Sequence, residues 1–191
     1  MGPSLTGTLG RVRLRPLAAE DADAVVRWRN EPSVAQQMFS PPPVSREAHL
    51  RWFERARVGG DREEFIILWR ASGAEAAVGT IGLSHIEPQH GRAEYGILIG
   101  DPSARGQGVA RAASELLLDY AFGPRGLERV YLQAFADNAA ALQLYVRLGF
   151  VREGVLRRHA RRDGEPRDVV VMGILKDEWL GRARERTDDE A

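Results

Sequence analysis

The sequence predicts a single-domain α/β fold in which helices flank a mixed, mainly antiparallel sheet. The chain has 191 residues, which suits one domain with one sizeable core. Apolar residues make up 43% and charged residues 28%, as is typical of globular proteins. Strand-like and helix-like segments follow the order β-α-α-β-β-β-α-β-α-β-β, and this order indicates a mixed sheet.

The first part of the chain is expected to form one strand and two helices. Alternating residues predict the strand over 11–15. A helix follows in AEDADAVVRWRN, where acidic residues come early and basic residues late, and Pro32 is expected to end it. A proline-rich loop spans 40–45, and Ser45 is the expected N-cap of the second helix.

The rest of the chain predicts an antiparallel meander and then two helices, a strand and a hairpin. Short connections join three apolar runs, EFIILWRA, AVGTIGLSHIE and RAEYGILIG. A helix is expected from about Val109 to Phe122, and a second helix, which follows the strand RVYLQAF, is expected to end at Gly149. The final hairpin is expected to turn at Asp163-Gly164.

Composition argues against several classes of protein. Lys and Arg total 27, and so do Asp and Glu, so no net charge recruits nucleic acid. The absence of cysteine excludes a disulfide scaffold, a thiolate zinc site and a cysteine nucleophile. The four histidines lack metal-ligand spacing, so no metal is expected. No run approaches the ~18 apolar residues of a membrane span and the start lacks an apolar signal core, so we expect a cytoplasmic protein without a membrane partner.

One loop, RGQGVAR from Arg105 to Arg111, suggests a phosphate site. It directly precedes a helix, whose first N–H groups have no partner within the helix and, with the helix dipole, attract anions. Its glycines allow close approach of the backbone, and its arginines add positive charge. Because several amides are available, a pyrophosphate is the expected ligand. A glycine-rich turn that only joins strand to helix is the alternative. The loop lacks the lysine of a Walker motif and the third glycine of a dinucleotide fingerprint.

Two motifs carry a family resemblance. The loop RGQGVA resembles the R/Q-x-x-G-x-G/A loop of the GNAT superfamily of acyl-CoA N-acetyltransferases. NAAALQLYVRLGF, from Asn138 to Phe150, is similar to the N-x-x-A-x-x-L-Y-x-x-x-G-F element of the same family. The resemblance covers roughly Arg11 to Trp179. We therefore expect an N-terminal extension over 1–10, a GNAT acetyltransferase domain over 11–180 and a charged, frayed tail over 181–191.

The resemblance implies acetyl-CoA as cosubstrate, held where one strand splays from the next. It implies that residues before the loop line the pantetheine arm, that the loop holds the pyrophosphate, and that two residues of the later motif contact the cosubstrate. These residues are, in that order, Leu98, Ile99 and Gly100; Arg105, Gly106, Gln107, Gly108, Val109 and Ala110; and Asn138 and Tyr145.

Direct acetyl transfer to an amine needs a neutral amine, a stabilised oxyanion and a thiolate that can leave. It needs no enzyme nucleophile, which agrees with the absence of cysteine. Tyr145 is the candidate acid for the departing sulfur, and a core tyrosine with a satisfied hydroxyl is the alternative.

The base is less directly indicated. Some relatives carry a glutamate where this chain has Gln133, which cannot accept the proton. Glu94 is the best substitute, with a surface charge on an edge strand as the equal alternative. His85 is a weaker option, and a chain of water molecules is another.

The acceptor is expected to be a primary amine, either a small molecule or a protein N-terminus. Trp28, Asn30 and Met38 resemble residues of amino-sugar acetyltransferases, although core packing is the better explanation of Trp28 and Met38. The C-terminal part resembles spermidine and ribosomal-protein N-terminal acetyltransferases equally. A polyamine would need carboxylates, for which Glu20, Asp21, Asp23, Glu31 and Glu47 are candidates. A nucleotide-linked sugar would suit Arg157, Arg158, Arg161 and Arg162.

Two further expectations concern the oligomeric state and whether the protein is an enzyme. A homodimer is the oligomeric state that we consider. A non-catalytic acyl-CoA-binding or regulatory module is the rival to an enzyme: Gln133 favours it slightly, whereas Tyr145 and the intact loop oppose it.

Overall fold

The structure is a computed structural model that describes residues 8–40 and 43–188; residues 1–7, 41–42 and 189–191 lie outside the described residues. Its strands form one eight-stranded sheet in the order β1-β2-β3-β4-β5-β6-β8-β7. All neighbouring strands are antiparallel except β5 and β6. The strands are β1 Thr8–Leu9, β2 Val12–Pro16, β3 Glu63–Trp69, β4 Ala76–Glu87, β5 Arg92–Ile99, β6 Arg129–Phe135, β7 Val151–Arg162 and β8 Glu165–Leu175. The prediction of a mixed, mainly antiparallel sheet is confirmed.

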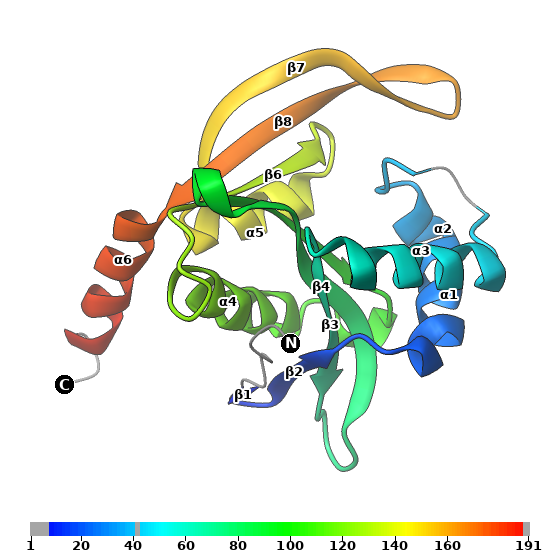
Figure 1. Cartoon of the computed structure of the whole chain (residues 1–191), viewed down its shortest axis with the longest axis horizontal. Helices are drawn as coiled ribbons and strands as arrows, with labels where there is room; N and C mark the ends of the chain where they lie inside the picture. Colours follow the sequence, from blue (N-terminus) through cyan, green and yellow to red (C-terminus); the bar gives the residue numbers. More distant parts are fainter. Residues whose placement is uncertain (1–7, 41–42, 189–191) are drawn as a thin grey trace.

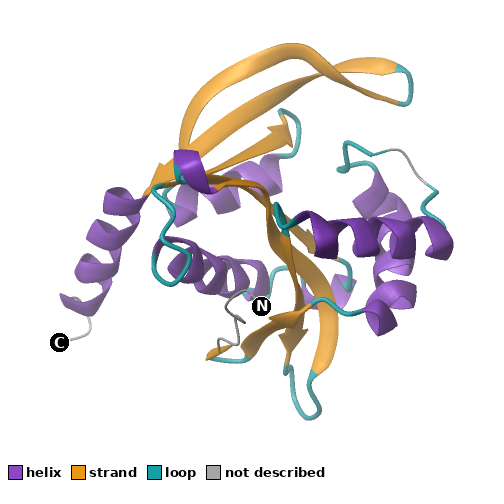
Figure 2. Cartoon of the chain, in the orientation of Figure 1, coloured by secondary structure: helices purple, strands orange, loops and turns teal. Residues whose placement is uncertain are grey.

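Helices cover both faces of the sheet (Figures 1 and 2). On one face, α4 and α5 pack on alternate residues of β3, β4 and β5, such as Phe65, Leu83 and Tyr95. On the other face, α1 to α3 pack on the intervening residues, such as Ile66 and Leu98. The helices are α1 Ala22–Asn30, α2 Pro32–Ala35, α3 Arg46–Gly59, α4 Val109–Phe122, α5 Ala139–Leu148 and α6 Lys176–Asp188.

Several local signals work as predicted. The Ser45 hydroxyl accepts a hydrogen bond from the Ala48 N–H at 3.1 Å and caps α3. Gly149 ends α5 in the left-handed conformation, with φ 99°. Pro32 behaves differently: α1 already ends at Asn30, and Pro32 opens α2, because its fixed φ suits the first turn of a helix.

The ends of the chain extend the expected domain. Residues of the expected N-terminal extension form β1, which pairs with β2. Helix α6 runs to Asp188 and so includes most of the residues that composition placed in a tail; residues 189–191 are not described. A boundary at residue 180 therefore does not coincide with the end of an element.

Strands β5 and β6 separate soon after they meet. Their pairing joins Arg92–Glu94 to Arg129–Tyr131, and within the described residues no later pair connects them. Strand β5 nevertheless continues to Ile99, and β6 continues to Phe135. This is the splayed strand pair that the family resemblance implies.

The hairpin of β7 and β8 projects from the body and arches over it (Figure 1). Arg162 at its turn fixes the hairpin to the body: its guanidinium donates to the Gln36 carbonyl at 3.1 Å, pairs with Asp137 and lies 5.0 Å from the centre of the Phe135 ring. These contacts hold the segment after α2 beside the end of β6.

Gly100, expected to line the pantetheine arm, is required for packing. A Cβ added there would overlap the Trp28 indole. We expect Gly100→Ala to lower the free energy of unfolding by about 1–3 kcal/mol, the usual cost of overpacking a core. Gly154→Ala is the control, because an added Cβ there meets no described atom within 4 Å. Urea unfolding of both variants checks this, and equal stabilities would contradict it.

Candidate active site

A cleft of about 940 Å³ opens where β5 and β6 part. Its walls come from both strands, from the loop before α4, from α5 and from the segment that follows α2. The two faces of the sheet therefore meet in one space. Consecutive residues show this: Tyr95 packs with the α4 and α5 core, whereas Glu94, the last residue of β5 to pair with β6, points to the opposite face.

The predicted anion loop has the expected geometry. Gly106 and Gly108 have φ of 72° and 76°, the left-handed region in which only glycine is unstrained. A Cβ at either position would meet no described atom within 4 Å, so the space beside both is open. Gly108 is the N-cap of α4, and no described side chain caps this helix. The first amides of α4 are therefore free to bind an anion.

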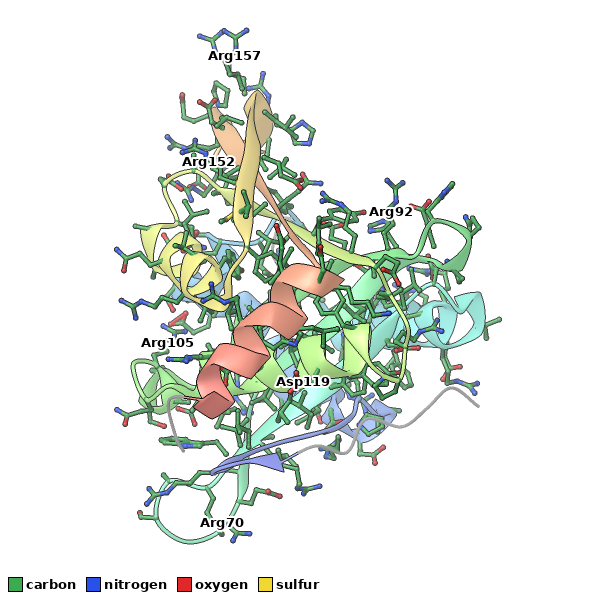
Figure 3. All side chains as sticks on the ribbon, turned by 90° about the vertical axis from the view of Figure 1, so that its left-hand side faces the viewer. Arg70, Arg92, Arg105, Asp119, Arg152 and Arg157 are labelled. Atoms are coloured by element: carbon green, nitrogen blue, oxygen red, sulfur yellow. The ribbon has the colours of Figure 1, made fainter. Side chains whose placement is uncertain are left out.

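The two arginines of the loop already have partners. Arg105 lies on the flank of the molecule near α4 (Figure 3), where its guanidinium donates to the Ser33 hydroxyl at 2.9 Å and to the Ile99 carbonyl at 3.3 Å. Arg111 donates to Glu115 at 2.9 Å. Both arginines line the cleft and place positive charge beside it, but the donors aimed at a phosphate are backbone amides.

The loop and β5 reach the cleft through some of the expected residues and not others. Arg105, Gly106, Gly108, Val109 and Ala110 line it, whereas Gln107 is exposed and is not among the lining residues.

On β5, Ile99 lines the cleft with Ile97, which sequence reasoning missed. The side chain of Leu98 packs in the opposite core, and Gly100 packs on Trp28. The period of two along a strand was the signal that could have selected 97 and 99.

Tyr145 presents an unbound hydroxyl to the cleft. Its ring packs edge-on against Tyr95 at 5.7 Å and against Phe150 at 5.9 Å, and the residue is 7% exposed. Burial raises the pKa of Tyr145 to about 12, so the phenol is protonated at neutral pH. Within the described part of the chain, its hydroxyl has no hydrogen-bond partner.

Tyr95, rather than Tyr145, is a core tyrosine whose hydroxyl has a hydrogen-bond partner. Its hydroxyl lies 2.7 Å from Ser114 Oγ, which itself donates to the Ala110 carbonyl at 2.6 Å.

Glu94 and His85, which the sequence offered separately, form a pair. His85 Nδ1 lies 2.8 Å from Glu94 Oε2, and both residues line the cleft. A bulge between Ser84 and Glu87 breaks the register of β4, and His85 adopts φ 47° there. The alternative that Glu94 sits on an edge strand is wrong, because β5 lies between β4 and β6.

Two side chains of the β6–α5 segment complete the inner wall. Gln133 lines the cleft beyond the point of separation. Asn138 also lines it, while its Oδ1 accepts a hydrogen bond from the Ala141 N–H at 3.2 Å and caps α5. The cap fixes Asn138 at the start of the helix that carries Tyr145.

The N-terminal candidates divide between cleft and core. Met38 lines the cleft together with Gln37, Phe39 and Ser40. Trp28 is 4% exposed and belongs to the core, as expected for packing. Asn30 does not line the cleft. Its side chain joins the end of α1 to the backbone before α3, because it accepts from the Val44 N–H at 2.7 Å and donates to the Val44 carbonyl at 2.9 Å.

The charged surface candidates lie elsewhere. None of the five acidic residues considered for a polyamine is among the lining residues. Asp21 pairs with Arg15, and Asp23 pairs with Arg46. The Glu31 carboxylate caps α2 by accepting a hydrogen bond from the Ser33 N–H. Arg157 projects from the hairpin away from the body (Figure 3).

The described residues contain neither a metal-binding cluster nor a membrane-spanning helix. Across the described residues, no group of three or more His, Cys, Asp or Glu side chains could hold a metal ion. None of the described helices is both long enough and apolar enough to cross a bilayer.

Comparisons with known proteins identify the fold and the chemistry. Residues 11–151 match the model of the acetyltransferase (GNAT) domain. The spermidine N(1)-acetyltransferase of Escherichia coli K12 is 30% identical over 88% of this chain and 88% of its own. An uncharacterized N-acetyltransferase of Bacillus licheniformis, p20, is 29% identical over 90% of this chain and 96% of its own. A crystal structure of the spermidine N-acetyltransferase of Vibrio cholerae with CoA and spermine superposes with a TM-score of 0.82, at 27% identity, over 89% of this chain and 98% of that one.

These similarities do not favour the rival of a non-catalytic module. The free amides of the α4 N-terminus and the gap between β5 and β6 suit a CoA thioester. The chain belongs to the GNAT acetyltransferase family, and it is an N-acetyltransferase that transfers an acetyl group from acetyl-CoA to an amine.

Proposed function

We propose that the cleft acetylates a small-molecule primary amine by direct attack, with Tyr145 as the acid and the Glu94–His85 pair as the proton acceptor. The observation that carries the proposal is the placement of these groups on opposite sides of the gap between β5 and β6. Tyr145 approaches from the α5 side with an unbound hydroxyl, and Glu94 approaches from the other face.

Acetyl-CoA enters from the side of α4 and α5 in this scheme. The amides that follow Gly108 bind its pyrophosphate, and Ile97 and Ile99 contact the pantetheine arm. Asn138 contacts the arm near the thioester. Tyr145, one turn before the end of α5, faces the sulfur.

The chemical step needs one group that accepts a proton, the Glu94–His85 pair, and one group that donates a proton, Tyr145. The Glu94–His85 pair takes a proton from the ammonium group, and the neutral nitrogen attacks the acetyl carbonyl. The tetrahedral intermediate then collapses, the C–S bond breaks, and Tyr145 donates its proton to the thiolate. The attacking nitrogen releases its surplus proton to solvent as the amide forms, the Tyr145 phenolate regains a proton from solvent, and the Glu94–His85 pair releases its own to solvent. Because the pKa of Tyr145 is raised to about 12, the phenol is protonated at neutral pH and carries the proton that the leaving thiolate needs.

A small-molecule acceptor is supported by the relatives, whose names specify spermidine. We further propose that the enzyme works in the cytoplasm, which the absence of cysteine supports, and that it forms a homodimer. The support for a dimer is β7, an edge strand with Val155 and Leu156 exposed. Light scattering on the purified protein tests the dimer.

A substitution in the loop tests the binding of acetyl-CoA. Gly108→Val should weaken binding by about tenfold or more, because the side chain blocks phosphate from the α4 amides. Gly126→Val is the matched control: Gly126 has φ 70° and similarly open surroundings among the described residues, but it does not line the cleft. Calorimetry should show loss of affinity in the Gly108 variant alone. Equal affinity in two folded variants would remove the loop from the site.

Replacement of the acid tests Tyr145. Tyr145→Phe should keep acetyl-CoA affinity and lower kcat by about 10²-fold, the usual worth of a general acid. The pH–rate profile of the wild type should show no loss from Tyr145 ionisation within an ordinary assay range, because its pKa is about 12. Tyr120→Phe, which alters a buried tyrosine that does not line the cleft and whose hydroxyl donates to Glu63, is the control. A wild-type kcat in the Tyr145→Phe enzyme would leave Tyr145 with a packing role only.

The pH dependence of Glu94→Gln tests the proton acceptor. The rate should fall most where the substrate amine is protonated, and higher pH should partly restore it, because solvent then replaces the carboxylate. If the pair acts as a unit, the double variant with His85→Gln should cost no more than the more damaging single change. If Glu94 instead binds a cationic substrate, the loss should appear in KM. Profiles parallel to the wild type with equal KM would exclude both roles and leave ordered water beside Gln133.

A further inference from the structure

The acceptor end of the cleft indicates the chemical class of the amine. We propose that Arg62 binds a carboxylate at the far end of the acceptor, so that the substrate is an amino-carboxylic acid rather than a polyamine. This inference rests on the proposed function, because it assumes that the amine lies at Glu94 and His85.

Arg62 and Glu94 face each other along one row of the sheet. Glu63 pairs with Leu83, and Glu64 pairs with Gly82, so the same register carried one residue back places Arg62 opposite Ser84. Ser84 in turn pairs with Glu94. Because neighbouring strands lie about 4.8 Å apart, the two Cα atoms are on the order of 10 Å apart. Both side chains point to the same face and line the same cleft.

The floor beside this row is open at Gly96, whereas the Glu64 side chain lies over Gly82, where an added Cβ would come within 2.6 Å of Glu64 Oε2. Gly82 of β4 pairs with Gly96 of β5 in the next row on the same face. A Cβ at Gly96 would meet no described atom within 4 Å, so the space above it is open. An extended acceptor can therefore approach the backbone at Gly96, with one end at Glu94, and reach past the Glu64 side chain to Arg62.

Arg62 is held in place and keeps excess positive charge. Its guanidinium donates to Glu64 at 2.9 Å and lies 5.6 Å from the centre of the Trp52 ring. Arg29 interacts electrostatically with the same carboxylate, and among the described residues its buried Nε has no hydrogen-bond partner. Two guanidinium groups thus share one carboxylate, which leaves a net positive charge at this wall of the cleft.

The same end of the cleft is unsuited to a polycation. Glu94 is the only carboxylate among the described residues that line the cleft, and it is already bound to His85. The segment Gln37–Ser40, which contributes the opposite wall, has no acidic residue. A polyamine has several amines with pKa values of roughly 10, and each buried ammonium needs an anionic partner.

Matched acceptors that differ only in the distal group test this directly. An ω-amino acid, the alkylamine and the diamine of the same length are compared, as in 4-aminobutanoate, butylamine and 1,4-diaminobutane, for a series of chain lengths. Thiol release from acetyl-CoA gives KM for each. At the best length we expect KM of the acid to lie about 10- to 100-fold below that of the diamine, the worth of a charge-assisted hydrogen bond.

Two variants assign the preference to Arg62. Arg62→Gln should abolish the preference for the acid, and Arg62→Glu should reverse it in favour of the diamine. Arg55→Glu, with the same change of charge at an exposed position of α3 outside the cleft, should retain the wild-type order. If Arg62→Glu fails to fold, the wild-type order and the Gln variant still decide. A wild-type preference for the diamine, or an unchanged order in Arg62→Gln, overturns the proposal.

Binding separates this inference from the proposed function. Calorimetry on the CoA-loaded enzyme measures the affinity of the same compounds without turnover. If affinity follows the predicted order while no amine is acetylated, the proposed catalytic assignments fail and the carboxylate site stands. If acetylation is rapid but the three compounds of each length bind equally, or none of them binds, the carboxylate site fails alone.

Discussion

The parting of β5 from β6 beyond Glu94 and Tyr131 is the constraint on which the site depends. Each strand keeps its outer neighbour: β5 stays paired with β4 as far as Ile99, and β6 stays paired with β8 along its whole length. The separation therefore leaves only the facing rows of backbone groups without ladder partners, and such groups need hydrogen bonds from elsewhere. A ligand that lies in the gap can supply them, which links the fold directly to acyl-CoA binding.

The gap also explains how the proposed acid and the proposed proton acceptor can reach one reaction centre. Adjacent residues of a strand point to opposite faces, so Tyr95 helps to position Tyr145 on one side while Glu94 faces the other. In an unbroken sheet these faces would be isolated from each other. The wall of the cleft that follows α2 is held in place by segments distant in sequence. Phe39 packs on Phe135 at 4.7 Å, and Arg162 donates to the Gln36 carbonyl and pairs with Asp137.

Sequence predicted the features that local chemistry controls. The cap at Ser45, the stop at Gly149, the turn at Asp163-Gly164 and the loop before α4 are each set by a few neighbouring residues. Side-chain phase and tertiary contacts were harder to predict: the Leu98 side chain packs in the opposite core while Ile97 lines the cleft, and Gly100 packs on Trp28. The pairing of His85 with Glu94 depends on a bulge, and the place of Arg62 in the cleft depends on the register of three strands; neither has a sequence signal of its own.

Hydrogen–deuterium exchange with and without acetyl-CoA tests the central claim most directly, because it reports on the backbone groups that the gap exposes. Binding should slow exchange in residues 95–99 of β5 and in residues 106–111 at the start of α4, and it should leave the pairing of β2 with β3 unchanged. Unaltered exchange in residues 95–99 at saturating acetyl-CoA would contradict the claim that the cosubstrate lies between β5 and β6.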